Sequence, residues 1–340
     1  MGMRFSLIAV VALVLISFLG VWGAGLNHFF GVAVPYLAIL ALFCGVVYRV
    51  LKWAGSPVPY CIPTTAGQQK SLTWIKQSAF DNPCTKRQAV GRMVLEVLLF
   101  RSLFRNTKFE MGQGAKLFYQ WEKWLWFAGL AFHYSFLVIL IRHLRFFTTP
   151  VPFFVYGVEK LDGFFQVGLP GIYITDAIFV LAVTYLLIRR VIIPQVRYIS
   201  LPQDYFPLFL LLAIGITGIL TRYFIRVDIT KVKQLAMGLI SFHPVVPEGI
   251  GVMFFIHLFL VSALFAYFPF SKLMHAGGVF LSPTRNLPNN SRIVRHVNPW
   301  NYPVKVHTYQ EYEDHFRDKM IEAGLPVEKG ADEIPTPVKG

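Results

Sequence analysis

The chain has 340 residues, of which 55% are hydrophobic, 16% aromatic and 15% charged, and its net charge is +14. A mean hydropathy of +0.53 excludes an ordinary soluble domain and is typical of an integral membrane protein. The positive charge does not indicate a nucleic-acid partner, because no recognition motif accompanies it.

Six apolar segments have the length of about 20 residues that a helix needs to cross the hydrocarbon core of a bilayer. They cover residues 5–22, 31–51, 121–147, 172–193, 205–225 and 249–275. Each must be helical, because backbone polar groups in lipid have to be satisfied within the segment. The predicted fold class is therefore an all-α integral membrane protein with six transmembrane helices, located in the cell membrane as a multi-pass protein.

The distribution of charge predicts the topology. Residues 52–123 contain eleven Lys or Arg against four acidic residues, and loops rich in Lys and Arg stay in the cytoplasm. The N and C termini are therefore expected in the cytoplasm, and the loop at residues 148–171 outside. Three basic residues fit this topology less well because they would lie outside: Arg226, Lys231 and Lys233.

Residues 1–51 are predicted to form two N-terminal transmembrane helices. The first begins with Arg4 and is followed by Gly23-Ala24-Gly25, which resembles the exit of a signal peptide. Because the chain retains Met1, we interpret this segment as an uncleaved span.

Residues 52–120 are predicted to form a basic cytoplasmic loop. Residues 56–60 are proline-rich and should be extended. Residues 88–104 contain both apolar residues and arginines, and they should form an amphipathic helix. This helix could lie on membrane lipid at the inner headgroup surface, or form a surface for a soluble partner.

The three cysteines are predicted to be packed or idle thiols. Cys44, Cys61 and Cys84 form no C-x-x-C pair, so we expect neither an iron–sulfur cluster nor a covalently attached haem in this chain.

Two membrane segments carry two histidines each. His133 and His143 are ten residues apart and face one interhelical seam. His257 and His275 are 18 residues apart, five turns of a continuous helix, and so would share one face. Histidine is costly in a membrane span and therefore indicates function. The four side chains could ligate two haem b irons, although any single histidine could instead bond a neighbouring carbonyl or hydroxyl.

The spacing of the four histidines sets a geometric condition. In straight helices the first pair would be about 15 Å apart and the second about 27 Å. Pro269 could kink the last helix, and tilt would have to absorb the rest. Depth in the membrane then pairs His143 with His257 near the outer face, and His133 with His275 near the inner face.

Several residues near these histidines have two open interpretations. Basic side chains that could bind haem propionates, or serve as interfacial anchors, are Arg142, Arg145 and Arg222. Gly215 and Gly218 would allow close approach of either a helix or a flat macrocycle.

The remaining histidines lie outside the predicted spans. His28 and His243, in outer loops, could exchange protons with a bound quinone. Residues 276–340 are predicted to form a cytoplasmic tail, irregular at 282–303 and helical at 309–323. The tail histidines, expected to be solvated or structural, are His296, His307 and His315.

The histidine pattern of residues 121–275 resembles the γ subunit of respiratory nitrate reductase, a di-haem cytochrome b that oxidises quinol. The resemblance implies a four-helix di-haem domain, with His133 and His275 on the inner haem and His143 and His257 on the outer one. The extra N-terminal span, the basic loop and the long tail look more like the cytochrome b subunits of the sulfite-reductase-associated membrane complex, a heterodisulfide-reductase-like menaquinol-oxidising complex of sulfur-metabolising prokaryotes.

The resemblance implies two haem b groups and menaquinone as cofactors. We expect menaquinone near His143 and His257, with Lys160 or Asp162 as proton partners. Electrons would pass inward to a cytoplasmic heterodisulfide-reductase-like iron–sulfur subunit on the basic loop and tail, in sulfite or sulfate respiration. Other membrane and periplasmic subunits are implied as well. The alternatives are a nitrate-reductase-type γ subunit serving another reductase, or a non-haem anchor or transporter, although no internal repeat supports transport.

Overall fold

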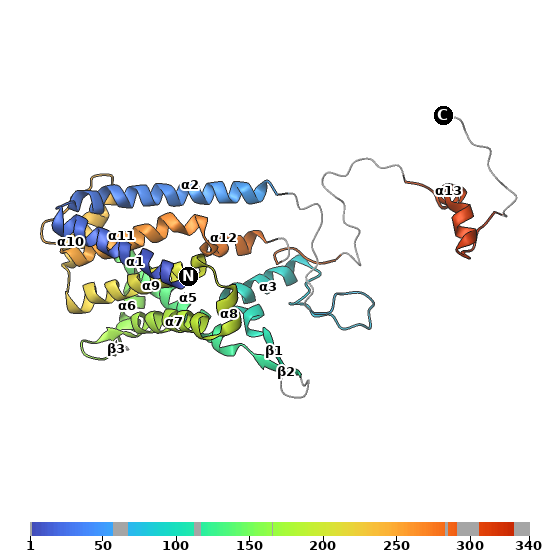
Figure 1. Cartoon of the computed structure of the whole chain (residues 1–340), viewed down its shortest axis with the longest axis horizontal. Coiled ribbons are helices and arrows are strands. Elements are labelled where there is room, and N and C mark those ends of the chain that lie inside the picture. Colours follow the sequence, from blue (N-terminus) through green and yellow to red (C-terminus); the bar gives the residue numbers. More distant parts are fainter. Residues whose placement is uncertain are drawn as a thin grey trace, which may run out of the picture.

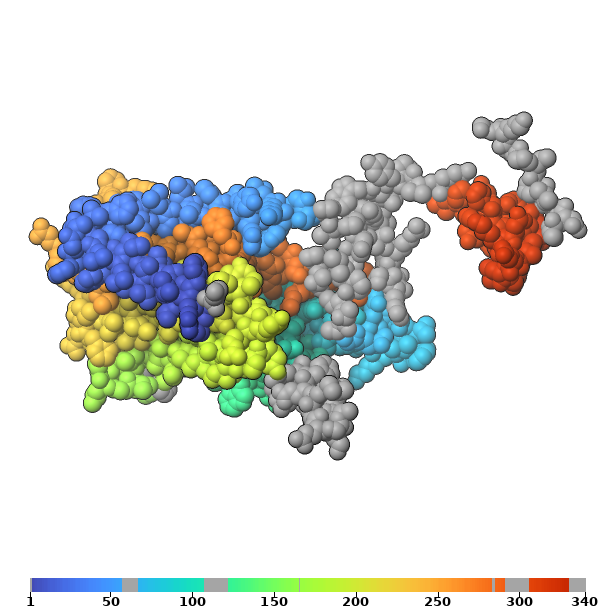
Figure 2. Space-filling view, viewed as in Figure 1, coloured from blue at the N-terminus to red at the C-terminus, as the bar shows by residue number. Residues whose placement is uncertain are grey.

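The computed structural model describes residues 2–56, 67–111, 117–164, 166–282, 285–290 and 306–329. Its long helices run side by side in an elongated bundle (Figures 1 and 2). Two short antiparallel hairpins add to the helices: β1 (Thr107–Met111) pairs with β2 (Leu117–Trp121), and β3 (Gln166–Val167) pairs with β4 (Ile172–Tyr173). The protein is thus predominantly helical, as the hydropathy predicts.

Five helical segments of the described chain are long and apolar enough to cross a membrane. They are Gly2–Gly23, containing α1 (Gly2–Phe18); Phe29–Ala54, containing α2 (Val34–Ala54); Lys123–Phe146, containing α5 (Lys123–His143); Pro202–Phe224, containing α9 (Pro202–Ile219); and Val252–Phe270, containing α11 (Val252–Tyr267). The protein is therefore a multi-pass membrane protein. The remaining predicted span corresponds to α7 (Ile174–Ile192), which has Asp176 in its first turn and Arg189 and Arg190 in its last.

Apolar packing holds these helices together. A buried cluster that includes Val10, Phe179, Leu210 and Leu260 joins α1, α7, α9 and α11, while α5 packs along α7 and α2 packs along α11. Large apolar side chains such as Phe43 of α2 are exposed on the bundle surface. An apolar exterior of this kind suits lipid as the surrounding solvent.

Short helices cover the two ends of the bundle (Figure 1). One end, called here the α10 end, carries α6 (Phe153–Phe164) and α10 (Ile229–Ile240). The opposite end, called the α3 end, carries α3 (Lys86–Leu99), α4 (Arg101–Phe104), α8 (Pro194–Ile199) and α12 (His275–Gly278). The predicted amphipathic helix corresponds to α3 and α4, separated by Phe100 at a positive φ of 49°.

The tail contains one described helix, α13 (Tyr309–Glu322), which matches the helix predicted there. Thr308 begins it with a capping box, since its side chain accepts from the Glu311 amide while the Glu311 side chain accepts from the Thr308 amide. Cys61, His296 and the proline-rich stretch from residue 57 lie outside the described residues.

The last predicted membrane segment is not one continuous helix, so the prediction that five helical turns place His257 and His275 on one face is wrong. α11 ends at Tyr267, and 3₁₀ turns follow at Phe268–Phe270 and Lys272–Met274. Between them Ser271 is extended, and its hydroxyl accepts from the Leu273 amide at 3.1 Å. Pro269 explains the break, because proline lacks the N–H that would continue the helix.

Candidate functional site

The structure brings the four membrane histidines together in two pairs. At the α3 end, the rings of His133 and His275 have centroids 6.1 Å apart and an interplanar angle of 80°. At the α10 end, the rings of His143 and His257 are 6.5 Å apart at an angle of 21°. These are the two pairs expected from depth in the membrane. Their role as haem ligands remains a prediction.

Hydrogen bonds at Nδ1 fix how these rings are presented. The Nδ1 atoms of His133 and His143 lie 2.7 Å from the carbonyl oxygens of Gly129 and Ile139, each one helical turn earlier. His275 Nδ1 lies 2.8 Å from the Lys272 carbonyl. A carbonyl can only accept, so these Nδ1 atoms carry the proton and donate it. In the neutral imidazole each Nε2 then carries a lone pair, as in metal-ligating histidines.

The fourth histidine is held by a side chain instead. His257 Nδ1 lies 3.0 Å from the Thr217 hydroxyl, which also lies 2.8 Å from the Ala213 carbonyl. Since the hydroxyl donates to that carbonyl, it can accept from His257 Nδ1. The Nε2 atom of His257 is thus free as well.

The distance between the rings of each pair fits a shared metal ion. A first-row metal such as zinc lies about 2.0 Å from a ligating histidine nitrogen. With ring bonds of about 1.33 Å, the length of a C–N bond with partial double-bond character, an imidazole has its centroid about 1.1 Å from each ring atom. Two imidazoles on opposite sides of one ion should therefore have centroids about 6.2 Å apart, close to the 6.1 and 6.5 Å of the two pairs.

The donor set fits haem better than a bare ion. In the described part of the chain, no group of three or more His, Cys, Asp or Glu side chains could hold a metal. A haem supplies four nitrogens of its own and needs only two axial ligands from the protein. Two histidines facing each other across a helix bundle are the arrangement that such a group requires.

Aromatic and small residues surround the pairs. Phe100 and Phe132 each place their rings 4.8 Å from the His133 ring. A Cβ added to Gly218 would lie 3.2 Å from His257 Cε1, whereas one added to Gly215 would lie 2.8 Å from Phe179. Gly215 therefore serves close packing of α9 against α7, and Gly218 allows the close approach of His257.

A buried ionic network lies beside His143. The Arg142 guanidinium pairs with Asp162 of α6 and, at 2.6 Å, with Asp176 of α7. Asp162 also accepts from the amide and hydroxyl of Thr175, and Asp176 accepts from the Tyr223 hydroxyl at 2.6 Å. Arg142 is thus already paired with two carboxylates, and Asp162 is occupied by Arg142 and Thr175.

The other predicted charged residues at this end differ in their environment. Arg145 pairs with Glu159, which lies 3.5 Å from Arg222. The Arg222 guanidinium also stacks 4.4 Å from the Tyr173 ring centroid. Lys160 is exposed on the last turns of α6.

The histidines expected outside the spans are exposed: His28, His243, His307 and His315. None of them joins the two pairs. Sequence reasoning did not single out the acidic and phenolic partners of the arginines, which are Glu159, Asp176 and Tyr223. Asp176 carried a usable signal, since a buried carboxylate in the first turn of an apolar helix needs a partner.

The α3 end has an ionic cluster of its own. Asp81 accepts from Arg101, Arg105 and Ser78. The hydrogen bond from the Arg101 guanidinium, with those of Ser78 and Arg105, holds the pKa of Asp81 well below its usual range despite burial. Two buried charged residues of α3 itself are Arg92 and Glu96, and Glu96 accepts from the Ser102 amide.

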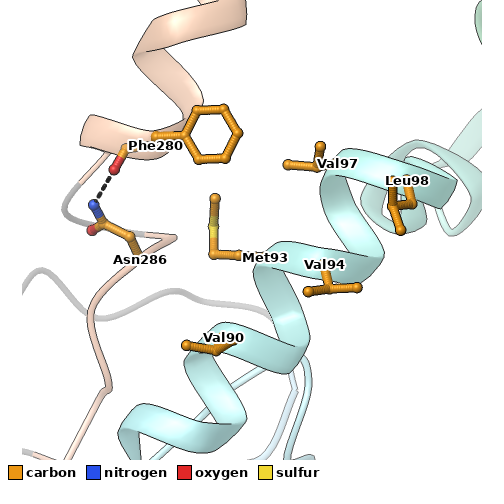
Figure 3. Close-up of a pocket in the computed structure, with 7 residues that line it drawn as sticks. All are labelled: Val90, Met93, Val94, Val97, Leu98, Phe280 and Asn286. Atoms are coloured by element: carbon orange, nitrogen blue, oxygen red, sulfur yellow. Dashed lines mark hydrogen bonds between the residues drawn. The ribbon is translucent and has the colours of Figure 1, made fainter.

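The opposite face of α3 is apolar and open. Val90, Val94 and Leu98 are exposed at a spacing of four residues. With other side chains of α3 and with Phe280 and Asn286 they line a groove of about 360 Å³ (Figure 3). Because Arg92 and Glu96 face the protein and the apolar residues face outward, α3 presents the surface of a helix that contacts lipid or another protein.

Comparison with known proteins identifies the family. The model of the nitrate reductase gamma subunit family matches residues 93–297. The chain is 48% identical over 278 residues to the Hdr-like menaquinol oxidoreductase cytochrome b-like subunit of Archaeoglobus fulgidus, covering 80% of this chain and 83% of that one. It is 43% identical over 275 residues to the subunit of the same name from Archaeoglobus profundus, covering 79% and 81%.

A more distant relative is the respiratory nitrate reductase 1 gamma chain of Escherichia coli, 28% identical over 182 residues, which are 49% of this chain and 76% of that one. The chain therefore belongs to the nitrate reductase gamma subunit family, in the branch of the cytochrome b-like subunits of Hdr-like menaquinol oxidoreductases.

Proposed function

We propose that this chain is a membrane electron-transfer subunit that holds two haem b groups. His133 and His275 would ligate one iron, and His143 and His257 the other. The observation that carries the proposal is that both pairs have the ring separation of two imidazoles on one ion, with every Nδ1 bonded and every Nε2 free. The names of the relatives support it, since they are cytochrome b-like subunits.

The proposed topology has six spans, with α7 as the sixth and both termini in the cytoplasm. α7 has 19 residues, which at about 1.5 Å per residue nearly matches a hydrocarbon core of about 30 Å. Arg189, Arg190 and Arg197 lie where α7 and α8 reach the α3 end. Basic residues remain inside, so the α3 end would be cytoplasmic and the α10 end external.

Menaquinol would be oxidised near His143 and His257 at the α10 end. When bound, low-spin haems with two histidine ligands carry single electrons rather than binding oxygen. Side chains at the α10 end would hold the quinol and accept its protons. Lys160 is accessible for that role, whereas Asp162 could act only if its pairing with Arg142 opened.

The electron acceptor would be a heterodisulfide-reductase-like iron–sulfur subunit at the α3 end. The printed name of the relatives, Hdr-like menaquinol oxidoreductase, supports such a complex. The exposed Lys86 and Arg87 at the start of α3, together with its open apolar stripe, offer a mixed basic and apolar surface. We propose further membrane and periplasmic subunits, and a place in sulfite or sulfate respiration. A γ subunit serving another reductase is the alternative.

A reduced-minus-oxidised absorption spectrum of the purified chain tests the proposal. We expect the signal of b-type haem at two haems per chain. His143→Ala and His275→Ala should each remove a different haem and leave one low-spin haem. A chain without any b-type signal would support the anchor or transporter alternative instead, and two intact haems in both variants would refute the pairing.

A further inference from the structure

The N-terminal helix α2 lies outside the residues that the family model matches, yet it packs along the broken part of the last span. A Cβ added to Gly45 would lie 2.5 Å from the Pro269 ring, in the 3₁₀ turn that follows the end of α11. Eight residues later on α2, the Trp53 ring comes within 3.2 Å of a Cβ added to Gly278. Residues at spacings of four share one helix face. Arg49, midway between these contacts, is therefore presented to the segment that contains His275.

Arg49 forms no ion pair with any carboxylate in the described part of the chain. Its Nε atom is buried and has no hydrogen-bond partner, and among the described residues no carboxylate or carbonyl oxygen bonds its guanidinium. Its guanidinium lies near the Trp53 ring, whose centroid is 5.9 Å from the Arg49 Cζ atom. By contrast, Arg142 and Arg189 each bind a carboxylate at 2.6 Å.

An unpaired cation in such a place needs a counter-ion. Burying a charged group costs free energy unless the group is paired and hydrogen-bonded. The planar guanidinium matches a carboxylate, which it can bind through two parallel hydrogen bonds. A haem carries two carboxylate side chains, and the nearest proposed haem is the one held by His133 and His275.

We infer that Arg49 binds a propionate carboxylate of the haem held by His133 and His275, so that the N-terminal pair of helices contributes to the inner haem site. The inference rests on the proposed function. It also has an electrostatic consequence, since a fixed cation stabilises the reduced iron, which carries one positive charge less than the oxidised iron. An anionic lipid headgroup is the other source of matching chemistry at this depth, and it would leave the haem unaffected.

The test is potentiometric titration of Arg49→Gln in a His143→Ala background, where only the inner haem remains. We expect the equilibrium constant for reduction to fall about tenfold, the effect of one charge at moderate distance in a medium of effective dielectric constant about 20. A tenfold change corresponds to about 59 mV for a one-electron couple. Arg49→Lys retains the positive charge, so it should leave the reduction potential of the inner haem close to that of the parent.

Lys52→Gln is the matched control, because Lys52 is an exposed cation less than one turn away on the same helix. It should leave the potential unchanged. Loss of the inner haem from Arg49→Gln alone, with Arg49→Lys and Lys52→Gln both retaining it, would also support the inference. Haem-free Arg49→Gln should be at least as stable as the haem-free parent, because it loses a partly buried cation that has no carboxylate partner among the described residues.

An unchanged inner-haem potential in Arg49→Gln would overturn the inference and favour a lipid headgroup. A shift in the potential of the outer haem alone, measured in a His275→Ala background, would also overturn the inference. Absence of any haem from the parent protein is a different result, which would refute the proposed function itself.

Discussion

The buried pairing of Arg142 with Asp162 and Asp176 gives a sharp prediction about stability. Arg142 joins α5 to α6 and α7, and its side chain is only 5% exposed. Replacing it with leucine leaves two buried carboxylates without their cation. Removing one partner of a buried ion pair costs about 3–5 kcal/mol. Thr175 and Tyr223 continue to donate to the two carboxylates, so we expect the lower end of that range.

The measurement is equilibrium unfolding of the detergent-solubilised protein by a denaturing detergent, followed by circular dichroism. Arg142→Leu should lower the free energy of unfolding by about 3 kcal/mol, and adding Asp162→Asn and Asp176→Asn should recover most of the loss because no unpaired charge remains. Arg145→Leu is the control, since its pair with Glu159 is 26% exposed on the arginine side and should be worth at most about 1 kcal/mol. Equal losses in the two arginine variants would refute the reasoning.

Three further predictions concern other parts of the molecule. Thr217→Val removes the 3.0 Å contact with His257 Nδ1. It should weaken retention of the proposed haem at His143 and His257 about 10- to 100-fold, measured by haem content on dilution, while Thr217→Ser should retain that haem. Gly45→Ala should lower thermal stability and disturb the proposed haem at His133 and His275, because its Cβ would lie 2.5 Å from the Pro269 ring. A Cβ at Gly157 would meet nothing within 4 Å, so Gly157→Ala should be neutral or stabilising by up to about 1 kcal/mol. The ionised Asp81 carboxylate, whose pKa is depressed in the folded protein, stabilises the loop beside α3 at pH values above its unfolded pKa near 3.8. This contribution is lost as the pH falls through the lower folded pKa. Limited proteolysis at different pH values should show this protection, and Asp81→Asn should abolish its pH dependence.

Hydropathy was sufficient to locate the long helices, because lipid imposes both their length and their composition. It could not locate α10, whose apolar residues cover only one face. A local signal was nevertheless present there, since Asp228 caps α10 by accepting from the Thr230 amide at 2.9 Å. α6 lies in the segment that was expected to be a loop, and its buried Asp162 becomes understandable only beside Arg142.

The candidate site was predictable to the extent that its residues are unusual in membranes. Histidine is rare in a span, so the four ligand candidates could be singled out from the sequence. The counter-ions of the arginines could not, because Asp176 is 34 residues from Arg142 and the two meet only through the packing of α7 on α5. The partner of a buried charge is set by tertiary packing, which spacing along the chain does not encode.

The break after α11 resolves the mismatch between the two histidine spacings. On continuous helices the pairs would be about 15 Å and 27 Å apart along their axes, and both could not be bridged across one seam. Because α11 ends at Tyr267, His275 does not lie on a continuation of that helix, and its ring centroid is 6.1 Å from that of His133. The segment after α11 must be held in place by something other than helical hydrogen bonds. Gly45 and Trp53 of α2 contact it on both sides of His275, so the geometry of the inner pair depends on a helix that contributes no histidine to it.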